Sequence, residues 1–404
     1  MVFTLRVPKQ PEGDLPPVSG ELPDSALATI SQRKFGLYLH VPFCVKRCGY
    51  CDFNTYTATE LGGFSAEQWP ELILLELELA NRTLPGLPKI DTIFIGGGTP
   101  SLISPDIYQS LLNELKNNFA KDIEITLEAN PDSVSRESLY GYFAAGINRI
   151  SFGMQSAAAN VLKVLDRTHN LTSVEQAVHG ASDVGFRNIS LDLIYGTPGE
   201  SDADWLNSLK FATDLPINHL SAYSLIVESG TKLAAQVKRG NIAQPDDDIA
   251  ASRYLTADQY LQQRGFGWYE ISNWSKPDGD CRHNQIYWQS DNWWGLGPGA
   301  HSHIGGVRWW NEKYPTTWAA ALQENLSPAA GREELNQQQQ QFESVMLQLR
   351  QRSGLSVSKL PRPDLVAQLT STGWLELAAL AGGRVVLSQS GRLMADRVAA
   401  ELLK

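Results

Sequence analysis

Short apolar segments alternate with longer amphipathic segments between residues 35 and 225 of the 404-residue chain. Six of the short segments are mostly β-branched or aromatic and predict strands at 35–41, 91–95, 123–128, 149–153, 187–194 and 219–225. Helix-length segments separate them, among them 66–81, 105–119, 135–144 and 173–184. This alternation predicts an α/β fold with a parallel sheet and right-handed crossovers, either open or curled into a partial barrel. Ligands of such folds bind at the carboxyl ends of the strands.

The segments on either side of this region differ from it in composition. Residues 1–30 are rich in proline and show no sustained periodicity, so we expect a draped or mobile extension. Residues 265–318 hold eight of the eleven Trp residues, and helices are expected at 341–351 and near 391–403. The predicted organisation is an N-terminal extension (1–30), a β/α core (31–230), an aromatic-rich subdomain (231–325) and a small C-terminal helical domain (326–404).

The composition narrows the classes of function. The chain has 34 Lys and Arg residues against 44 Asp and Glu, a net charge of −10, which argues against a general nucleic-acid binder. Its apolar runs fall far short of the ~20 residues of a membrane span. Its N-terminus has no apolar segment of the signal-peptide type. We therefore expect a cytoplasmic protein without a membrane span.

Three of the four cysteines lie within eight residues, at Cys44, Cys48 and Cys51. They follow the first predicted strand directly, so their loop lies at the functional edge of the sheet. Three thiolates at this spacing can hold three irons of a [4Fe–4S] cluster and leave the fourth iron open. A zinc site with a distant fourth ligand is one alternative. A redox pair formed by Cys48 and Cys51 is another, and it leaves Cys44 unexplained.

The run LYLHVPFCVKRCGYCDFNTY (residues 37–56) resembles the signature of radical S-adenosylmethionine (SAM) proteins. Within them it is similar to the oxygen-independent coproporphyrinogen III oxidases and the related radical SAM haem chaperones. The resemblance implies a partial (β/α)6 TIM-like barrel of the radical SAM type with a small α-rich C-terminal domain. It implies that SAM chelates the open iron of the cluster and that an electron donor serves the cluster. One electron would then cleave SAM to a 5′-deoxyadenosyl radical.

Glycines and polar residues recur at the ends of the next predicted strands. Gly96, Gly97 and Gly98 follow the second strand, where missing side chains let the backbone approach a ligand; a tight turn is the alternative. Glu128, Gln155 and Asp192 lie at or near the ends of later strands, and Arg167 lies beyond Gln155. A buried carboxylate is costly unless it is paired or used. An internal Glu–Arg–Asp ion-pair network is therefore the alternative to a ligand site.

The resemblance gives these positions roles in binding SAM. Gly97, Gly98 and Thr99 would contact its methionine part. Its ribose, amino and carboxylate groups would be held by Glu128, Gln155, Arg167 and Asp192. Tyr38 matches a position beside the cluster, Tyr50 one beside the adenine, and Ile226 a main-chain contact to the adenine. His40, four residues before Cys44, is either a structural histidine or a residue that supports the cluster ligands.

Residues 281–288 read CRHNQIYW and carry a candidate haem site. Neutral imidazole is a common haem ligand, which makes His283 the candidate, and aromatic rings can pack on the macrocycle. The alternative is that these rings form the core of a closing subdomain and that His283 caps a turn. The H-N-x-x-Y-W motif resembles that of the haem chaperones, and GLGPGAHSH (295–303) matches the run that follows it. Cys281 is a thiolate ligand, a covalent attachment point or a buried inert thiol.

Two features separate the chaperones from the oxidases in this resemblance. The oxidases carry a fourth cysteine where this chain has Phe53, and their N-terminal region is longer. The resemblance therefore implies a haem chaperone that passes haem to an acceptor protein such as a respiratory haem protein. The alternative is a coproporphyrinogen III oxidase, which decarboxylates propionate side chains with two SAM; this activity is not expected. A radical SAM enzyme with another substrate is a third possibility.

Overall fold

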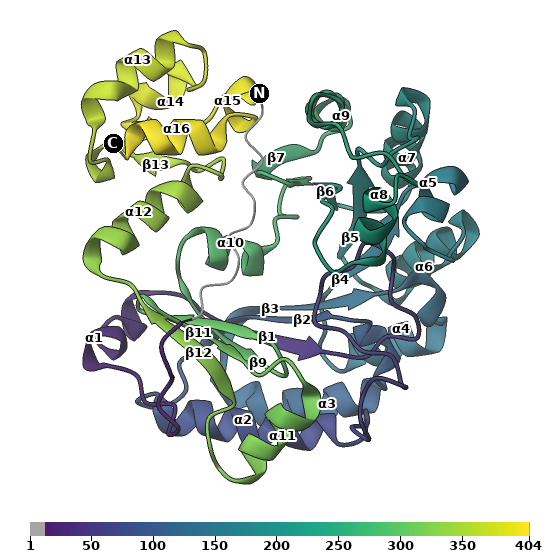
Figure 1. Ribbon diagram of the computed structural model, residues 1–404, viewed down its shortest axis with the longest axis vertical. Coiled ribbons are helices and arrows are strands. Elements are labelled where there is room, and N and C mark those ends of the chain that lie inside the picture. Colours follow the sequence, from purple (N-terminus) through teal and green to yellow (C-terminus); the bar gives the residue numbers. More distant parts are fainter. Residues whose placement is uncertain (1–12, 404) are drawn as a thin grey trace.

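A twelve-stranded sheet forms the centre of the computed structural model, which describes residues 13–403 (Figure 1). All six predicted strands are present, and each pairs in parallel with the next. They are β1 (Phe35–Val41), β2 (Ile90–Gly97), β3 (Phe119–Ala129), β4 (Arg149–Gln155), β5 (Asn188–Tyr195) and β6 (His219–Ser224). Their carboxyl ends therefore meet at one edge of the sheet, where the candidate site was expected.

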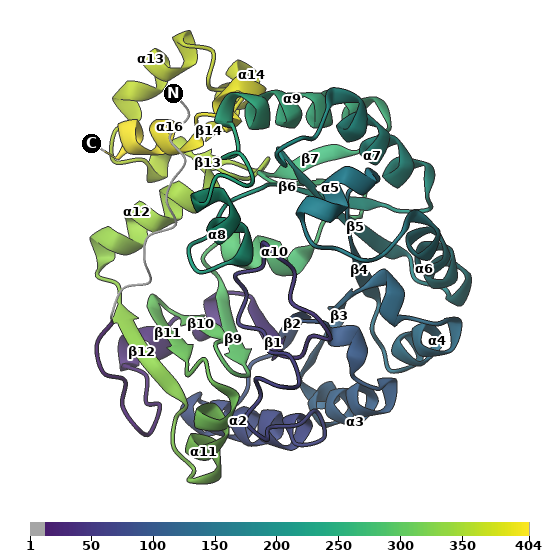
Figure 2. The same ribbon diagram turned by 45° about the vertical axis from the view of Figure 1, so that its right-hand side comes forward.

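Helices cover the outer side of these strands (Figures 1 and 2). They are α2 (Trp69–Thr83), α3 (Pro105–Leu115), α4 (Arg136–Ala144), α5 (Ala159–Val164), α6 (Leu171–Val184) and α7 (Asp202–Asp214). Capping boxes begin three of them, because Ser135, Asn170 and Ser201 each accept a bond from the third helical N–H. The expected helix 105–119 was wrong at its end: α3 stops at Leu115, a 3₁₀ turn follows, and Phe119 already begins β3.

The aromatic-rich segment adds strands to both edges of the same sheet. At one edge β9 (Asn292–Leu296) pairs in parallel with β1, and β10 (His301–Ile304), β11 (Val307–Asn311) and β12 (Ala329–Glu334) follow antiparallel. At the other edge lie β8 (Asn273–Ser275) and β7 (Gly267–Glu270). Trp274, Trp294 and Trp318 belong to the hydrophobic cluster that also contains β1. The sheet and its core therefore run without a break across residue 230.

Four more helices lie in this part of the chain: α8 (Lys232–Lys238), α9 (Asp247–Gln263), α10 (Arg282–Trp288) and α11 (Pro315–Gln323). Figures 1 and 2 show α10 on the inner side of the sheet, opposite the outer helices. It contacts β1, β2 and β9. The motif H-N-x-x-Y-W therefore lies inside the curved sheet.

The C-terminal region has a hydrophobic core of its own, which includes Val345, Leu355, Val385 and Leu402. Its elements are α12 (Gln337–Gln348), β13 (Leu355–Ser356), α13 (Val366–Ser371), α14 (Leu377–Ala381), β14 (Arg384–Val385), α15 (Gln389–Arg392) and α16 (Ala395–Leu402). The region joins the main body through Arg392, which forms two hydrogen bonds of 2.8 and 2.6 Å with the Asp258 carboxylate.

The described part of the N-terminal extension lies along β12. Asp14 forms a β-bridge with Arg332, and α1 (Asp24–Leu27) follows. Residues 1–12 of the predicted extension lie outside the described residues. No helix within residues 13–403 is long and apolar enough to cross a bilayer.

Candidate cofactor and haem site

The three cysteines lie on a loop that packs back onto the end of β1. The Cys44 N–H donates to the Tyr56 carbonyl (3.0 Å), and the Cys51 N–H donates to the Cys48 carbonyl (3.3 Å). All three thiols are unpaired and partly buried, and they line one pocket of about 140 Å³. Burial and the neighbouring Cys48 and Cys44 raise the pKa of Cys51 to about 11. Three thiolates here would repel one another, so a strongly positive partner is needed to hold them all ionised.

The spacing of these thiols fits a cluster better than a single ion. Among residues 13–403 no group of three His, Cys, Asp or Glu side chains is arranged around a position for one metal ion. In an iron–sulfur cluster each thiolate binds a different iron, so the sulfur atoms need not converge on one point. The zinc alternative requires four protein ligands around one ion, and the described residues do not supply them.

Gly97 and Gly98 bring the end of β2 against the cysteine loop. Gly97 has a φ of +112°, which favours glycine, and a Cβ there would lie 2.6 Å from the His40 ring. A Cβ on Gly98 would lie 2.4 Å from the Phe43 carbonyl oxygen. The Thr99 hydroxyl is 3.8 Å from the Cys44 sulfur, and all three residues line the pocket between the cysteines. The glycines are therefore required by a close approach of two backbone segments.

Glu128 and Asp192 are two partly buried carboxylates that form no ion pair within residues 13–403. The Gly97 N–H donates to Glu128 (3.1 Å), and the Ser151 hydroxyl donates to both Asp192 oxygens (3.0 Å). Burial and the charge of Asp192 raise the pKa of Glu128 to about 8, and burial raises that of Asp192. Within residues 13–403 no ion pair joins Glu128 or Asp192 to an arginine, although the charges of Arg149 and Arg167 favour the ionised form of Asp192. Two unpaired carboxylates in one pocket would attract a cationic ligand.

Arg167 turns toward the cysteine loop instead of toward these carboxylates. It donates to the Cys48 sulfur (3.3 Å), to the Asn130 side chain (2.8 Å) and to the Gly153 carbonyl (2.8 Å). Its buried Nε has no hydrogen-bond partner among residues 13–403. Gln155 has a φ of 64°, uncommon for a residue with a side chain, at a register shift between β4 and β5. Such strain is found at functional sites, where a bulge redirects a side chain.

A second pocket of about 430 Å³ continues into the interior of the curved sheet. It shares Tyr50, Glu128, Gln155 and Asp192 with the pocket between the cysteines. Ile226 follows β6, is 55% exposed and lies at its rim. The two pockets therefore bring together the predicted SAM residues of five strand ends and the cysteine loop.

Tyr38 and His40 lie beside these pockets and are hydrogen-bonded to each other. The Tyr38 hydroxyl is 3.0 Å from His40 Nδ1, and His40 Nε2 is 2.8 Å from the Asn54 carbonyl. Burial lowers the pKa of His40 to about 4, which keeps it neutral. With both nitrogens bonded, His40 fits the structural alternative: it connects β1 to the cysteine loop.

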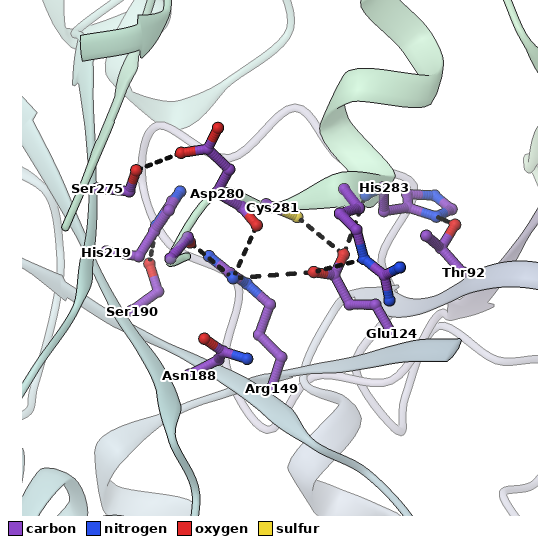
Figure 3. Close-up of polar contacts among 12 residues, drawn as sticks. Thr92, Glu124, Arg149, Asn188, Ser190, His219, Ser275, Asp280, Cys281 and His283 are labelled. Atoms are coloured by element: carbon purple, nitrogen blue, oxygen red, sulfur yellow. Dashed lines mark hydrogen bonds and ion pairs between the residues drawn. The ribbon is translucent and has the colours of Figure 1, made fainter. Parts of the chain in front are cut away.

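His283 is fully buried on α10 (Figure 3). Its Nδ1 is 2.7 Å from the Thr92 hydroxyl, and its Nε2 is 2.8 Å from the Tyr287 hydroxyl. Its ring also packs on Phe94, with centroids 5.2 Å apart. Burial lowers the pKa of His283 to about 3, so the imidazole is neutral. In this arrangement neither ring nitrogen has a free lone pair for iron.

A buried polar cluster lies beside His283, as Figure 3 shows. The Glu124 carboxylate accepts hydrogen bonds from the backbone N–H of His283 (3.0 Å) and from the Cys281 thiol (3.7 Å). It also forms an ion pair with Arg149 (3.9 Å). Burial and the nearby Glu124 raise the pKa of Cys281 to about 12, which fits a buried protonated thiol.

Sequence reasoning missed several residues of the interior pocket, notably Arg149 and Ser151. The signal for them is the alternation along β4, where Arg149, Ser151 and Gln155 face the same pocket. It also missed Asn130, which orients Arg167.

Three comparisons place the chain among known proteins. It matches the family model of the radical SAM superfamily over residues 38–212. The heme chaperone HemW of Mycobacterium tuberculosis is 46% identical over 387 residues, 95% of this chain and 98% of that protein. HemW of Bacillus subtilis is 32% identical over 377 residues, 89% and 97% of the two chains.

The coproporphyrinogen III oxidase HemN from Escherichia coli has a similar structure, with a TM-score of 0.78 at 22% identity. The match covers 93% of this chain and 92% of that chain. It confirms the predicted α/β fold of the radical SAM type.

Proposed function

The chain belongs to the HemW family of haem chaperones within the radical SAM superfamily, and we propose that it binds haem and passes it to an acceptor protein. The observation that carries this proposal is the similarity to curated haem chaperones along nearly the full length of both chains. This chain has Phe53 at the position where the similar coproporphyrinogen III oxidases carry a fourth cysteine, which also supports a chaperone over an oxidase. The acceptor is proposed to be a respiratory haem protein, and the location is proposed to be the cytoplasm.

We propose Cys44, Cys48 and Cys51 as ligands of a [4Fe–4S] cluster that binds SAM at its open iron. The support is a shared pocket of three unpaired thiols beside Gly97 and Gly98. With an electron donor, the bound cluster and SAM would supply reductive cleavage of the SAM sulfonium. The Arg167 guanidinium, 3.3 Å from the Cys48 sulfur, would stabilise that thiolate.

The residues around this pocket suit the charges of SAM. Glu128 and Asp192 would attract its positive groups, and Gln155 and Arg167 would orient its ribose and carboxylate. The backbone of Gly97, Gly98 and Thr99 leaves room for the methionine part, Tyr50 and Ile226 would enclose the adenine, and Tyr38 would support the cluster loop. The support for these roles is that both carboxylates line the shared pocket and form no ion pair within the described residues.

The test against the oxidase alternative is an anaerobic assay with coproporphyrinogen III, SAM and a reductant. The cluster-reconstituted full chain should form no protoporphyrinogen at catalytic turnover and should bind one haem per chain. Turnover of coproporphyrinogen without haem binding would overturn the proposal. The Cys48→Ser variant is the matched control, because any radical chemistry must disappear with the cluster.

A further inference from the structure

Arg167 is a partly buried cation that contacts a cysteine sulfur instead of a carboxylate. One terminal nitrogen of its guanidinium donates to the Cys48 sulfur (3.3 Å), and the side chain forms no ion pair within residues 13–403. A cation held away from water is costly unless a negative charge compensates it. A cluster bound by the thiolates of Cys44, Cys48 and Cys51 would supply that negative charge.

The other terminal nitrogen of the guanidinium holds the side chain in this direction. It donates to the side-chain oxygen of Asn130 (2.8 Å), which follows β3, and to the carbonyl of Gly153 (2.8 Å) in β4. Both acceptors are uncharged. They therefore orient the guanidinium toward the cysteine loop without neutralising it.

The backbone around Arg167 is fixed by the fold as well. Its N–H donates to the Leu162 carbonyl (2.9 Å), and the nearby Leu165 is fully buried in a hydrophobic cluster. Two residues further on, His169 Nε2 lies 2.7 Å from the Met154 carbonyl. The guanidinium is therefore placed beside the cysteine loop by contacts within the protein.

The carboxylate next to Arg167 in the sequence is already paired. The ammonium groups of Lys46 and Lys232 each lie 2.7 Å from an oxygen of Asp166. The negative charge of Asp166 is thus offset by two lysines, which leaves the charge of Arg167 to act on the cysteines.

No other cation of the described residues donates a hydrogen bond to a cysteine sulfur. Arg47 lies on the same loop, but it is exposed and forms an ion pair with Glu60 (3.4 Å). The donor at Cys44 is the neutral hydroxyl of Thr99, at 3.8 Å. The contact of Arg167 with Cys48 is therefore the charged one.

A cationic donor at a cluster ligand favours the reduced cluster, because reduction adds one negative charge. Hydrogen bonds to the sulfurs and net charge are known determinants of the reduction potential of iron–sulfur clusters. We infer that Arg167 raises the reduction potential of the cluster through its hydrogen bond to Cys48, and that Asn130 is a positioning residue for it. The inference rests on the proposed cluster and adds to the proposed role of Arg167 in binding SAM. Its Nε, which has no hydrogen-bond partner among residues 13–403, is left for SAM.

The test is an anaerobic potentiometric titration of the cluster-reconstituted full chain without SAM, in which electron paramagnetic resonance measures the reduced cluster. Arg167→Met removes the charge and the donors. The equilibrium constant for one-electron reduction should fall about tenfold or more, which shifts the potential by about 59 mV to a more negative value. Arg167→Lys keeps the charge without the planar group, and its potential should lie between those of the wild type and Arg167→Met.

Two further variants separate the contact from general effects of charge and folding. Asn130→Ala leaves the charge of the chain unchanged and should lower the potential by a smaller amount, because the Gly153 carbonyl still holds Arg167. Arg47→Met is the matched control. It removes one positive charge from the cysteine loop without touching a sulfur, so its potential should equal that of the wild type.

The outcomes distinguish this inference from the proposed function. A wild-type chain that assembles no cluster overturns the proposed cofactor and the inference with it. A wild-type cluster whose potential is unchanged in Arg167→Met, or shifts as far in Arg47→Met, overturns only the inference. If Arg167→Met contains no iron, Asn130→Ala decides, and an unchanged potential in that variant overturns the inference.

Discussion

SAM binding should strengthen as the pH rises from 7 to 9, because Glu128 must lose a proton. Burial and the charge of Asp192 raise the pKa of Glu128 to about 8, and among residues 13–403 only the Gly97 N–H donates a hydrogen bond to its carboxylate. The sulfonium of SAM would favour the ionised carboxylate and lower this pKa on binding. Binding near neutral pH therefore releases a proton from the site.

The magnitude follows from that pKa. At pH 7 a group with a pKa of about 8 is roughly one-tenth ionised, and at pH 9 it is roughly nine-tenths ionised. The affinity should rise about tenfold between these values, or about 1.4 kcal/mol. In the absence of SAM, the raised pKa of Glu128 makes the folded state less stable as the pH rises. The native state retains a proton that the unfolded chain releases, so the free energy of unfolding falls as pH rises from 4.5 to about 8.

The assay is anaerobic calorimetric titration of the cluster-reconstituted chain with SAM, in buffers of different ionisation enthalpy. The α-amino group of SAM also titrates near pH 8, so the wild type alone cannot isolate Glu128. The matched variant is Glu128→Gln, whose affinity should lack the tenfold rise and whose proton release should fall by nearly one per SAM. Equal pH dependence in the two proteins would refute the reasoning.

Three further changes test other parts of the structure. Cys48→Ser should lose iron and the absorbance near ~400 nm of thiolate-bound Fe–S; full iron content would contradict the cluster assignment. Gly98→Ala places a Cβ 2.4 Å from the Phe43 carbonyl oxygen and should lower SAM affinity at least tenfold, as measured by the same calorimetry. Arg392→Met leaves the Asp258 carboxylate without its cationic partner and should destabilise the C-terminal region by about 3–5 kcal/mol in urea unfolding; an unchanged midpoint would contradict that.

Local patterns were sufficient to predict the core of the fold. The six parallel strands are apolar, short and separated by helices, so each could be recognised from its own residues. The pairing of β9 with β1 could not, because it joins residues more than 250 positions apart. The Trp-rich segment predicted an aromatic subdomain, whereas its strands complete the edges of the central sheet.

The site shows the same limit at single residues. The spacing of Cys44, Cys48 and Cys51 predicted a shared pocket, since the three lie on one short loop. The sequence could not reveal that His283 pairs with Thr92, 191 positions away, or that His301 lines an open cleft. The sequence also could not show whether Glu128 and Asp192 form ion pairs with Arg167, because this depends on the direction of the Arg167 side chain, which contacts Cys48 and Asn130 instead.

The central claim is that this chain carries haem and releases it to another protein. The most direct test loads the full chain with equimolar haem, removes unbound haem by gel filtration, and then adds an apo-globin as acceptor. We predict one haem per chain after filtration and complete transfer to the globin, followed by its Soret band. Haem that elutes apart from the chain, or that stays on it in the presence of excess acceptor, would contradict the claim.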